Sequence, residues 1–153
     1  MRLNLGCGHD PLPDWRNVDS HAEEADVVGD IRELHFHGIT EVRMSHVLEH
    51  ISWRETNDVL KRIHGWMRPL SHLSIEVPDM EQIIKEAPMN PDWLRYFYGS
   101  QEHEGEYHRT GFTAISLASA IHKSGFTFAE VIRFRSTNPH RDNMPCLLAT
   151  AFA

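Results

Sequence analysis

The sequence is poor in cysteine: Cys7 and Cys146 are the two present in 153 residues. Cys7 lies between two glycines in a stretch that predicts a tight turn, so we expect no disulfide and a reducing, cytoplasmic location. Long apolar runs are also absent, and none approaches the ~20 residues of a membrane span. The opening MRLNLGCG lacks the apolar segment of a signal peptide. We therefore expect no membrane partner.

Basic residues are scarce as well. The 15 Lys and Arg are outnumbered by 22 Asp and Glu, which gives a formal net charge of −7. Nucleic-acid binding depends on Lys and Arg that neutralise phosphates, and the sequence has no basic stripe. This balance argues against nucleic acid as a partner. The composition, 41% hydrophobic and 24% charged, is typical of one globular domain over residues 1–153.

The order of the predicted elements indicates an α/β fold with a mostly parallel sheet, whose last two strands could pair antiparallel. The segments after the first two strands are too short for crossover helices. We therefore expect trimmed N-terminal helices, one face of the sheet with exposed apolar surface, and a homodimer that covers it. The predicted strands are 3–5, 16–19, 25–29, 41–45, 73–77, 126–134 and 146–153, and the predicted helices are 53–67, 80–87, 92–98 and 114–124.

Two glycines follow the first predicted strand, in Leu3-Asn4-Leu5-Gly6-Cys7-Gly8. Glycines at a strand end let the backbone turn sharply and approach a ligand closely. A dinucleotide site would have a third glycine and an acid ~20 residues further on. Here position 11 is proline and Asp19 comes too early, which disfavours NAD. Asp19 can instead accept hydrogen bonds from a ribose diol, and Asp30 is placed to meet an adenine amino group.

The stretch SHVLEH, residues 45–50, fits the H-x-x-E-H pattern of some zinc proteases. A zinc pair of this kind requires both His on one face of a helix. Residues 41–45 predict a strand, however, and a capping box at 52–55 predicts a helix that starts near Trp53. The two His are therefore expected in a turn. We predict no metal site, and a zinc hydrolase that uses HVLEH stays as a remote alternative.

Taken together, LNLGCG, NVDS, VVGDI, SHVLEH and SIEVPD resemble class I S-adenosylmethionine-dependent methyltransferases, in particular a small group similar to methyltransferase type 11. The later GSQEHEGEYHRTGFTAISLASAIHKSGF is similar to the same group, so the resemblance spans about residues 2–134. The turn at 68–71 departs from the usual K-P-G-G. The resemblance implies a Rossmann-like, doubly wound and mostly parallel sheet with an antiparallel C-terminal strand. The resemblance implies S-adenosyl-L-methionine as cofactor, held by Leu5, Gly6, Cys7, Gly8, Asp19, Ser20, Asp30, Ile31, Ser45 and His46.

The resemblance also implies in-line displacement at the cofactor's sulfonium methyl group. The leaving group would be a neutral thioether, so the reaction needs no general acid. An oxygen acceptor needs a base, and His108 and His50 are the candidates. No N/D-P-P-Y/F motif follows the fourth strand, which together with the acidic charge favours a small-molecule acceptor. O-methylation of a sugar or polysaccharide precursor is the preferred reaction. The alternative is a cofactor-binding domain that does not catalyse.

Overall fold

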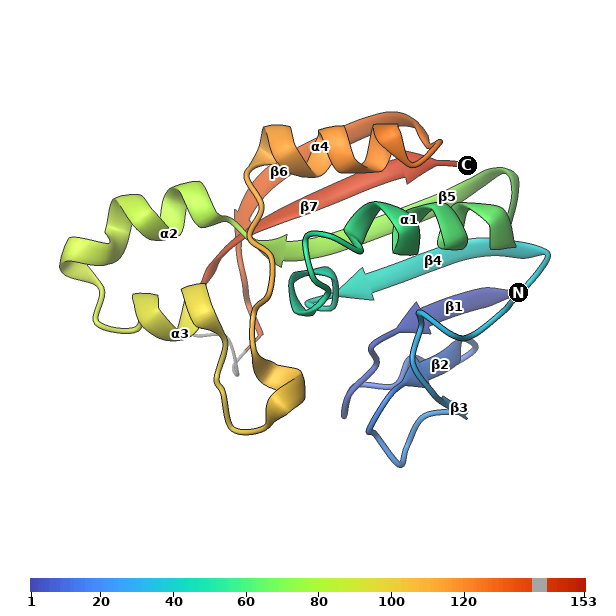
Figure 1. Ribbon diagram of the computed structural model, residues 1–153, viewed down its shortest axis with the longest axis horizontal. Helices are drawn as coiled ribbons and strands as arrows, with labels where there is room; N and C mark the ends of the chain where they lie inside the picture. The colour runs from blue at the N-terminus through green and yellow to red at the C-terminus, as the bar shows by residue number, and fades with distance from the viewer. Residues whose placement is uncertain (139–142) are drawn as a thin grey trace.

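The structure, a computed structural model, describes residues 1–138 and 143–153 and is built on one seven-stranded sheet of order β3-β2-β1-β4-β5-β7-β6 (Figure 1). β7 runs antiparallel to both of its neighbours, and the other neighbouring strands are parallel. This confirms the predicted Rossmann-like sheet with its antiparallel C-terminal strand. The strands are β1 (Arg2–Leu5), β2 (Arg16–Asp19), β3 (Val27–Val28), β4 (Ile39–Ser45), β5 (Met67–Pro78), β6 (Thr127–Arg135) and β7 (Pro145–Phe152).

Two helices, α1 and α4, lie side by side over one face of the sheet, while α2 and α3 lie beyond the ends of the strands (Figure 1). Thr113 caps α4 as predicted, because its hydroxyl accepts the backbone N–H of Ser116. The α-helices are α1 (Thr56–Trp66), α2 (Met80–Glu86), α3 (Trp93–Tyr98) and α4 (Ala114–Lys123), and the 3₁₀ turns are η1 (Leu48–His50), η2 (Ala87–Met89) and η3 (Glu104–Glu106).

Two predicted boundaries are wrong. Helix α1 begins at Thr56 and not near Trp53, because Ser52 does not form the predicted capping box. The Ser52 hydroxyl instead accepts the N–H of Arg54, two residues further on, in a turn. The segment 68–71 is part of β5 and not a turn before it. Backbone hydrogen bonds that join Leu70 and Ser71 to Ala153 hold this segment in the sheet. Long-range pairing of this kind leaves no local signal. The predicted 135–145 loop lies partly outside the described residues.

The face of the sheet opposite α1 and α4 is mixed in character and not uniformly apolar. Among the described residues, no helix stands between β1 and β2 or between β2 and β3, so the N-terminal helices are trimmed as predicted. Strand register, however, places a row of polar residues across the sheet: Asn17, Asn4, Arg43, Ser74 and Thr150. Exposed apolar residues share this face, because the register places Ile132 and Phe152 on the same side as Thr150, and they are 47% and 37% exposed. The homodimer stays a prediction.

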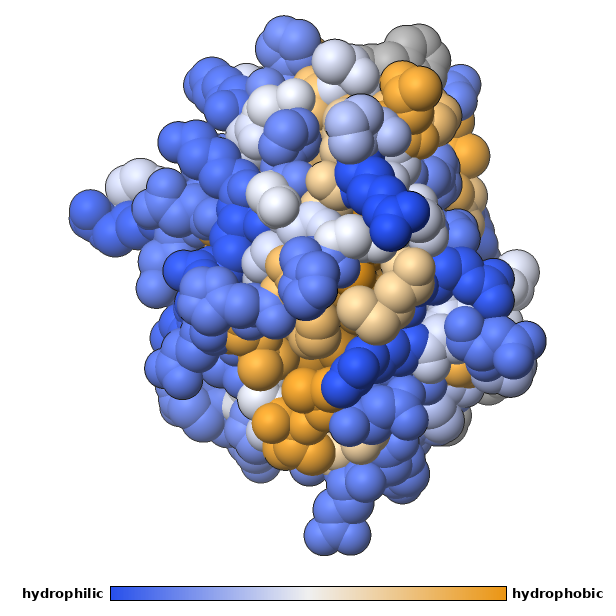
Figure 2. Space-filling model, turned by 90° about the vertical axis from the view of Figure 1, so that its right-hand side faces the viewer, coloured by the Kyte–Doolittle hydropathy of each residue, from blue (hydrophilic) through white to orange (hydrophobic). Residues whose placement is uncertain are grey.

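Exposed apolar residues also occur near the N-terminal strands. On the side of the molecule in Figure 2, hydrophobic residues gather in the lower half, at the height of the N-terminal strands in Figure 1. Val28, on the edge strand β3, is 60% exposed. In the part of the chain that the structure describes, no helix combines the length and the apolar character needed to cross a bilayer.

The turn after β1 brings the backbone against the turn after β4. Gly6 has a φ of +68°, and a Cβ there would stand 2.1 Å from Cγ2 of Val47. Gly8 has a φ of +51°, but a Cβ there would have no neighbour within 4 Å. Glycine is therefore required at position 6 for both conformation and space, and at position 8 for conformation alone.

We expect Gly6→Ala to lower the free energy of unfolding by about 2–5 kcal/mol, from left-handed strain of ~1–2 kcal/mol and overpacking of ~1–3 kcal/mol. Gly8→Ala is the matched control and should cost only the ~1–2 kcal/mol of strain. Urea denaturation of both variants measures the difference. Equal losses would contradict the contact between Gly6 and Val47.

Candidate functional site

A cleft of about 970 Å³ opens at the carboxyl ends of β1 to β4. Its size is within the range of ~300–1,000 Å³ for small-molecule sites, and its place is that of ligand sites in open α/β sheets. Leu5 does not reach the cleft, because its side chain is fully buried in the core. The other predicted cofactor residues all line it: Gly6, Cys7, Gly8, Asp19, Ser20, Asp30, Ile31, Ser45 and His46.

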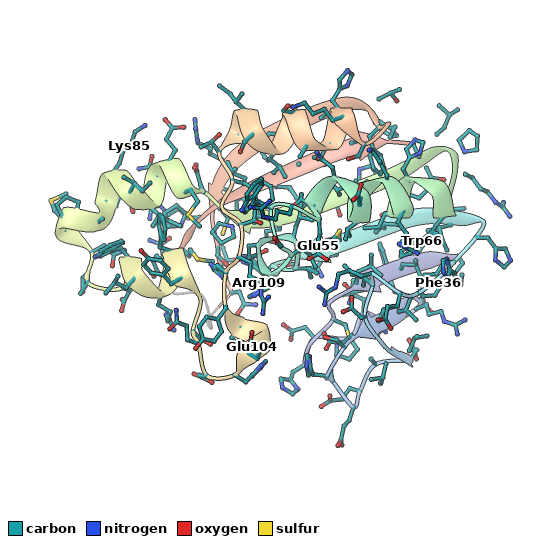
Figure 3. All side chains as sticks on the ribbon, viewed as in Figure 1. Phe36, Glu55, Trp66, Lys85, Glu104 and Arg109 are labelled. Carbon is teal, nitrogen blue, oxygen red and sulfur yellow. The ribbon has the colours of Figure 1, made fainter. Side chains whose placement is uncertain are left out.

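The facing wall comes from α3 and from the segment that follows it. Arg95 and Tyr96 of α3 line the cleft, as do both histidines predicted as bases, His50 and His108. Glu104 and Arg109 face each other across the segment (Figure 3), with 2.5 Å between the guanidinium and the carboxylate. Neither Arg95 nor Arg109 was singled out from the sequence as a site residue, although Arg109 lies within the segment GSQEHEGEYHRTGF.

Asp19, at the end of β2, has a carboxylate that the backbone orients. Oδ2 accepts the N–H of Gly8 at 2.9 Å, and Oδ1 accepts the N–H groups of His21 and Ala22 at 2.8 and 3.0 Å. Burial opposes the charge, but these three donors outweigh it and lower the pKa of Asp19 below its ordinary value. The group is therefore a fixed, ionised acceptor on the floor of the cleft.

The Asp30 carboxylate is hydrogen-bonded to the side chain of Arg32. The Arg32 guanidinium contacts its carboxylate in a fork, with Nε 3.0 Å from Oδ1 and Nη2 2.5 Å from Oδ2. Hydrogen bonding from Arg32 holds the pKa of Asp30 below its usual value. Both oxygens of this carboxylate already accept hydrogen bonds. The predicted contact with an adenine amino group must therefore compete with Arg32.

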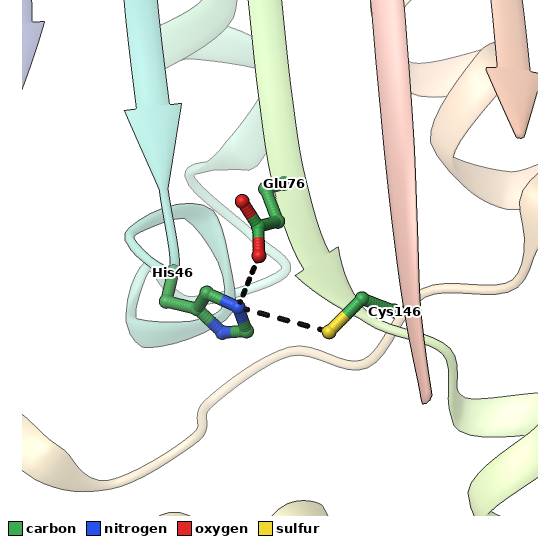
Figure 4. A group of neighbouring side chains, drawn as sticks. All are labelled: His46, Glu76 and Cys146. Carbon is green, nitrogen blue, oxygen red and sulfur yellow. Dashed lines mark hydrogen bonds and ion pairs between the residues drawn. The ribbon is translucent and has the colours of Figure 1, made fainter. Parts of the chain in front are cut away.

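The turn after β4 holds a buried charged cluster. His46, with a φ of 55°, places Nδ1 2.9 Å from Glu49 Oε1 and Nε2 3.1 Å from Glu76 Oε1 (Figure 4). Sγ of Cys146 lies 3.8 Å from the same Nε2. Burial opposes a charge on the imidazole, but Glu49, Cys146 and Glu76 outweigh it, so the pKa of His46 lies well above its ordinary value.

A second cluster joins Glu49 to both predicted bases. One ligand-type atom each from Glu49, His50 and His108 lies within 4.8 Å of the others. Among the described residues, Glu49 Oε2 and His108 Nδ1 are buried polar atoms without a hydrogen-bond partner. Burial, and the nearby His50 ring, lower the pKa of His108 despite the attraction of Glu49. His108 therefore offers a neutral imidazole with an unused lone pair.

These two clusters argue against the zinc-protease interpretation of HVLEH. His46 groups with Glu76 and Cys146, whereas His50 groups with Glu49 and His108. The two His of the motif thus belong to different clusters in the described part of the chain, and the i, i+4 zinc pair is not formed. Sequence reasoning missed Glu76 and Cys146 as neighbours of His46, because 30 and 100 residues separate them from it.

By sequence, no family model and no curated protein matches this chain. By structure, it is similar to a S-adenosylmethionine-dependent methyltransferase from Archaeoglobus fulgidus, with 14% identity, a TM-score of 0.69, and 99% of this chain and 85% of that one covered. It is also similar to 1,6-didemethyltoxoflavin-N1-methyltransferase from Burkholderia thailandensis, solved with S-adenosylhomocysteine. The identity is 19% and the TM-score 0.65, and 99% of this chain and 69% of that one are covered.

A third similar structure is mitomycin 7-O-methyltransferase, at 16% identity and a TM-score of 0.60, with 99% of this chain and 48% of that one covered. One of these proteins is named for methylation at nitrogen and another for methylation at oxygen. Identities this low establish the fold alone. That fold is the one of class I S-adenosylmethionine-dependent methyltransferases, as the sequence resemblance implied.

We expect His46→Ala to lower the free energy of unfolding by about 3–5 kcal/mol, because it leaves the fully buried Glu49 carboxylate without its partner. His72→Ala is the control. That ring is about one third exposed and 3.9 Å from Glu41, so its loss should cost about 0–1 kcal/mol. Chemical denaturation in the presence of a chelator measures both. A small loss for His46→Ala would mean that Glu49 is not ionised.

Proposed function

We propose that residues 1–153 form one domain that transfers a methyl group from S-adenosyl-L-methionine to a small-molecule acceptor. The observation that carries this proposal is the pairing of the Gly6–Gly8 turn with the Asp19 carboxylate on one cleft, joined by the hydrogen bond from Gly8 N–H. The methyltransferase fold supports it, since ligands of open α/β sheets bind at the carboxyl ends of the strands.

In this proposal the cofactor lies across the ends of β1, β2 and β4. The backbone of Gly6, Cys7 and Gly8 borders the methionine and sulfonium end, where the absence of two side chains allows close approach. Asp19 accepts hydrogen bonds from the ribose hydroxyls. Its two oxygens offer about four acceptor sites, of which backbone N–H groups take three. Ser20 lines the cleft beside it.

The remaining proposed cofactor contacts come from residues at the ends of β3 and β4. The backbone of Ile31 borders the adenine, and Asp30 reaches its amino group if Arg32 releases the carboxylate. Ser45 and His46 line the cleft at the end of β4, on the side of the reacting methyl group. His46 is held there by Glu49 and does not need the cofactor for its position.

S-adenosylmethionine would supply an electrophilic methyl group at this place, with a neutral thioether as the leaving group. Alignment of the acceptor by the cleft would then supply most of the catalysis, and the acceptor proton would pass to the His108 side chain, which lines the cleft. The ring's only other nitrogen serves its hydrogen bond to the Phe97 backbone, which leaves Nδ1 unprotonated. The nearby Glu49 carboxylate then stabilises the imidazolium that forms. His50 is the second candidate.

The acceptor side of the cleft is polar, with Glu104 and Arg109 on the segment that faces the strands. Such groups can pair with several hydroxyls of one molecule, which favours a sugar or polysaccharide precursor and O-methylation. The net charge of −7 disfavours nucleic acid. A domain that binds the cofactor without catalysis would keep the Asp19 site and lack turnover with any acceptor.

Calorimetric titration tests the cofactor. We expect the wild-type protein to bind S-adenosylmethionine and S-adenosylhomocysteine with micromolar affinity, and Asp19→Ala to weaken both by at least tenfold, or ~1.4 kcal/mol. Glu23→Ala removes the same charge from an exposed position outside the cleft and should change neither. Absence of binding to the folded wild-type protein would refute the proposal.

Turnover tests the base. In a screen of hydroxylated sugars for S-adenosylhomocysteine release, we expect His108→Asn to reduce kcat by ~10²–10⁴-fold and to leave cofactor affinity unchanged. The exposed His122→Asn is the control. Because Glu49, His50 and His46 face His108 and its pKa is lowered, kcat/KM of the wild type should be flat above pH ~6.5 and fall below it. An unaltered kcat would remove His108 as the base.

A further inference from the structure

Three potential metal ligands, His46, Glu76 and Cys146, converge at the ends of β4, β5 and β7 (Figure 4). The proposed methyl transfer uses neither Glu76 nor Cys146, and the Cys146 thiol is fully buried. We propose that His46 Nε2, Glu76 and Cys146 Sγ bind a divalent transition-metal ion, for which Zn²⁺ is the best fit. This site goes beyond the proposed methyl transfer and does not depend on it.

The distances between the donor atoms suit one tetrahedral ion. Zinc bonds of about 2.0–2.1 Å to nitrogen, about 2.0–2.2 Å to oxygen and about 2.3 Å to sulfur place nitrogen and oxygen ~3.4 Å apart and nitrogen and sulfur ~3.6 Å apart. The observed separations are 3.1 Å from His46 Nε2 to Glu76 Oε1 and 3.8 Å from His46 Nε2 to Cys146 Sγ. An ion fits between these atoms after shifts of a few tenths of an ångström, and its binding releases the protons of His46 Nε2 and Cys146 Sγ to solvent.

Two of the three ligands, His46 and Glu76, have a partner that would orient them. Glu49 Oε1 contacts Nδ1 of His46 at 2.9 Å, which fixes the ring and leaves Nε2 for the ion. A carboxylate behind a histidine is the usual outer shell of a protein zinc site. Ser45 Oγ donates to Glu76 Oε2 at 3.1 Å, so the other carboxylate oxygen faces the histidine. Glu49 is itself completely buried, which makes this support rigid.

The backbone also holds His46 in an uncommon conformation. Its φ of 55° lies in the left-handed region, which is uncommon for residues other than glycine, although Asn, Asp and His adopt it more often than the rest. Residues in such conformations persist where the surroundings impose them, and they cluster at functional sites. Here the residue in this conformation is the one that carries the imidazole into the cluster.

The ligand types select the metal. A thiolate, an imidazole and a carboxylate together favour Zn²⁺ over the hard ions Mg²⁺ and Ca²⁺, which take oxygen ligands. Three protein ligands leave one position for a water or for an oxygen of a bound molecule, as in zinc sites that take part in chemistry. His46 lines the main cleft, and Glu76 lines a second hollow of about 230 Å³ beside it, together with Ser45 and Arg43.

Metal titration of the purified full chain, treated with chelator and free of S-adenosylmethionine, tests the proposal. We expect one Zn²⁺ per chain at micromolar affinity or tighter. Co²⁺ at the same site should give a thiolate-to-cobalt charge-transfer absorption. Cys146→Ser should weaken Zn²⁺ binding at least 100-fold and abolish that absorption, and Glu76→Gln, a second variant should the first not fold, should weaken binding similarly.

Two controls locate the ion. Cys7→Ser removes the other cysteine and should preserve both affinity and absorption. His108→Ala disrupts the Glu49–His50–His108 cluster and should also preserve both. Absence of stoichiometric zinc in the folded wild-type protein would show that the cluster is a buried ion-pair network only. Wild-type binding by Cys146→Ser would place the ion elsewhere, and either result would overturn the proposal while leaving the test of the cofactor untouched.

Discussion

Glu49 is the residue on which the arrangement of the cleft depends. Its buried carboxylate holds the His46 imidazole, and its backbone carbonyl accepts the N–H groups of Arg109 and Thr110 at 2.7 and 3.0 Å. Thr110 adds a second link through its hydroxyl to the carbonyl of Ile51. One short turn after β4 therefore positions both the strand-end side of the cleft and the wall that faces it. A charge buried this completely is costly unless it is paired, which ties the turn to His46.

Side-chain hydrogen bonds replace the missing helices of the N-terminal half. Asn17 on β2 accepts the N–H of Leu12 and donates to the carbonyls of Leu12 and Trp15, and the Asp26 carboxylate accepts its backbone N–H. Asn4 on β1 donates to Asn17 from a fully buried position. Short parallel connections lack the packing that a crossover helix supplies. Here a buried amide network that joins β1, β2 and residues 12–15 performs that task.

The sequence predicted those parts of the fold that depend on neighbours along the chain. Alternating apolar residues located the strands, the glycine turn located the cleft, and Thr113 located the start of α4. The failures depended on distant partners. Pairing with Ala153 draws residues 70 and 71 into β5, and strand order alone brings Cys146 to His46. The hydrogen bonds from Arg32 to Asp30 could not be predicted either, because two residues that are two positions apart have no fixed relative orientation outside a helix or strand.

The contrast between Asp19 and Asp30 has a consequence for which molecules this cleft can admit. Backbone N–H groups alone orient the Asp19 carboxylate, whereas the Asp30 carboxylate is bound by the Arg32 side chain, which would have to move before a ligand could bind there. In the proposed binding mode, we expect recognition to be strict at the sugar, which Asp19 would bind, and lenient at the base, which Asp30 would bind. Analogues with an altered purine should lose little affinity, whereas those that lack a ribose hydroxyl should lose much. A cleft built in this way would be a natural starting point for labelled or bulky-base cofactor analogues.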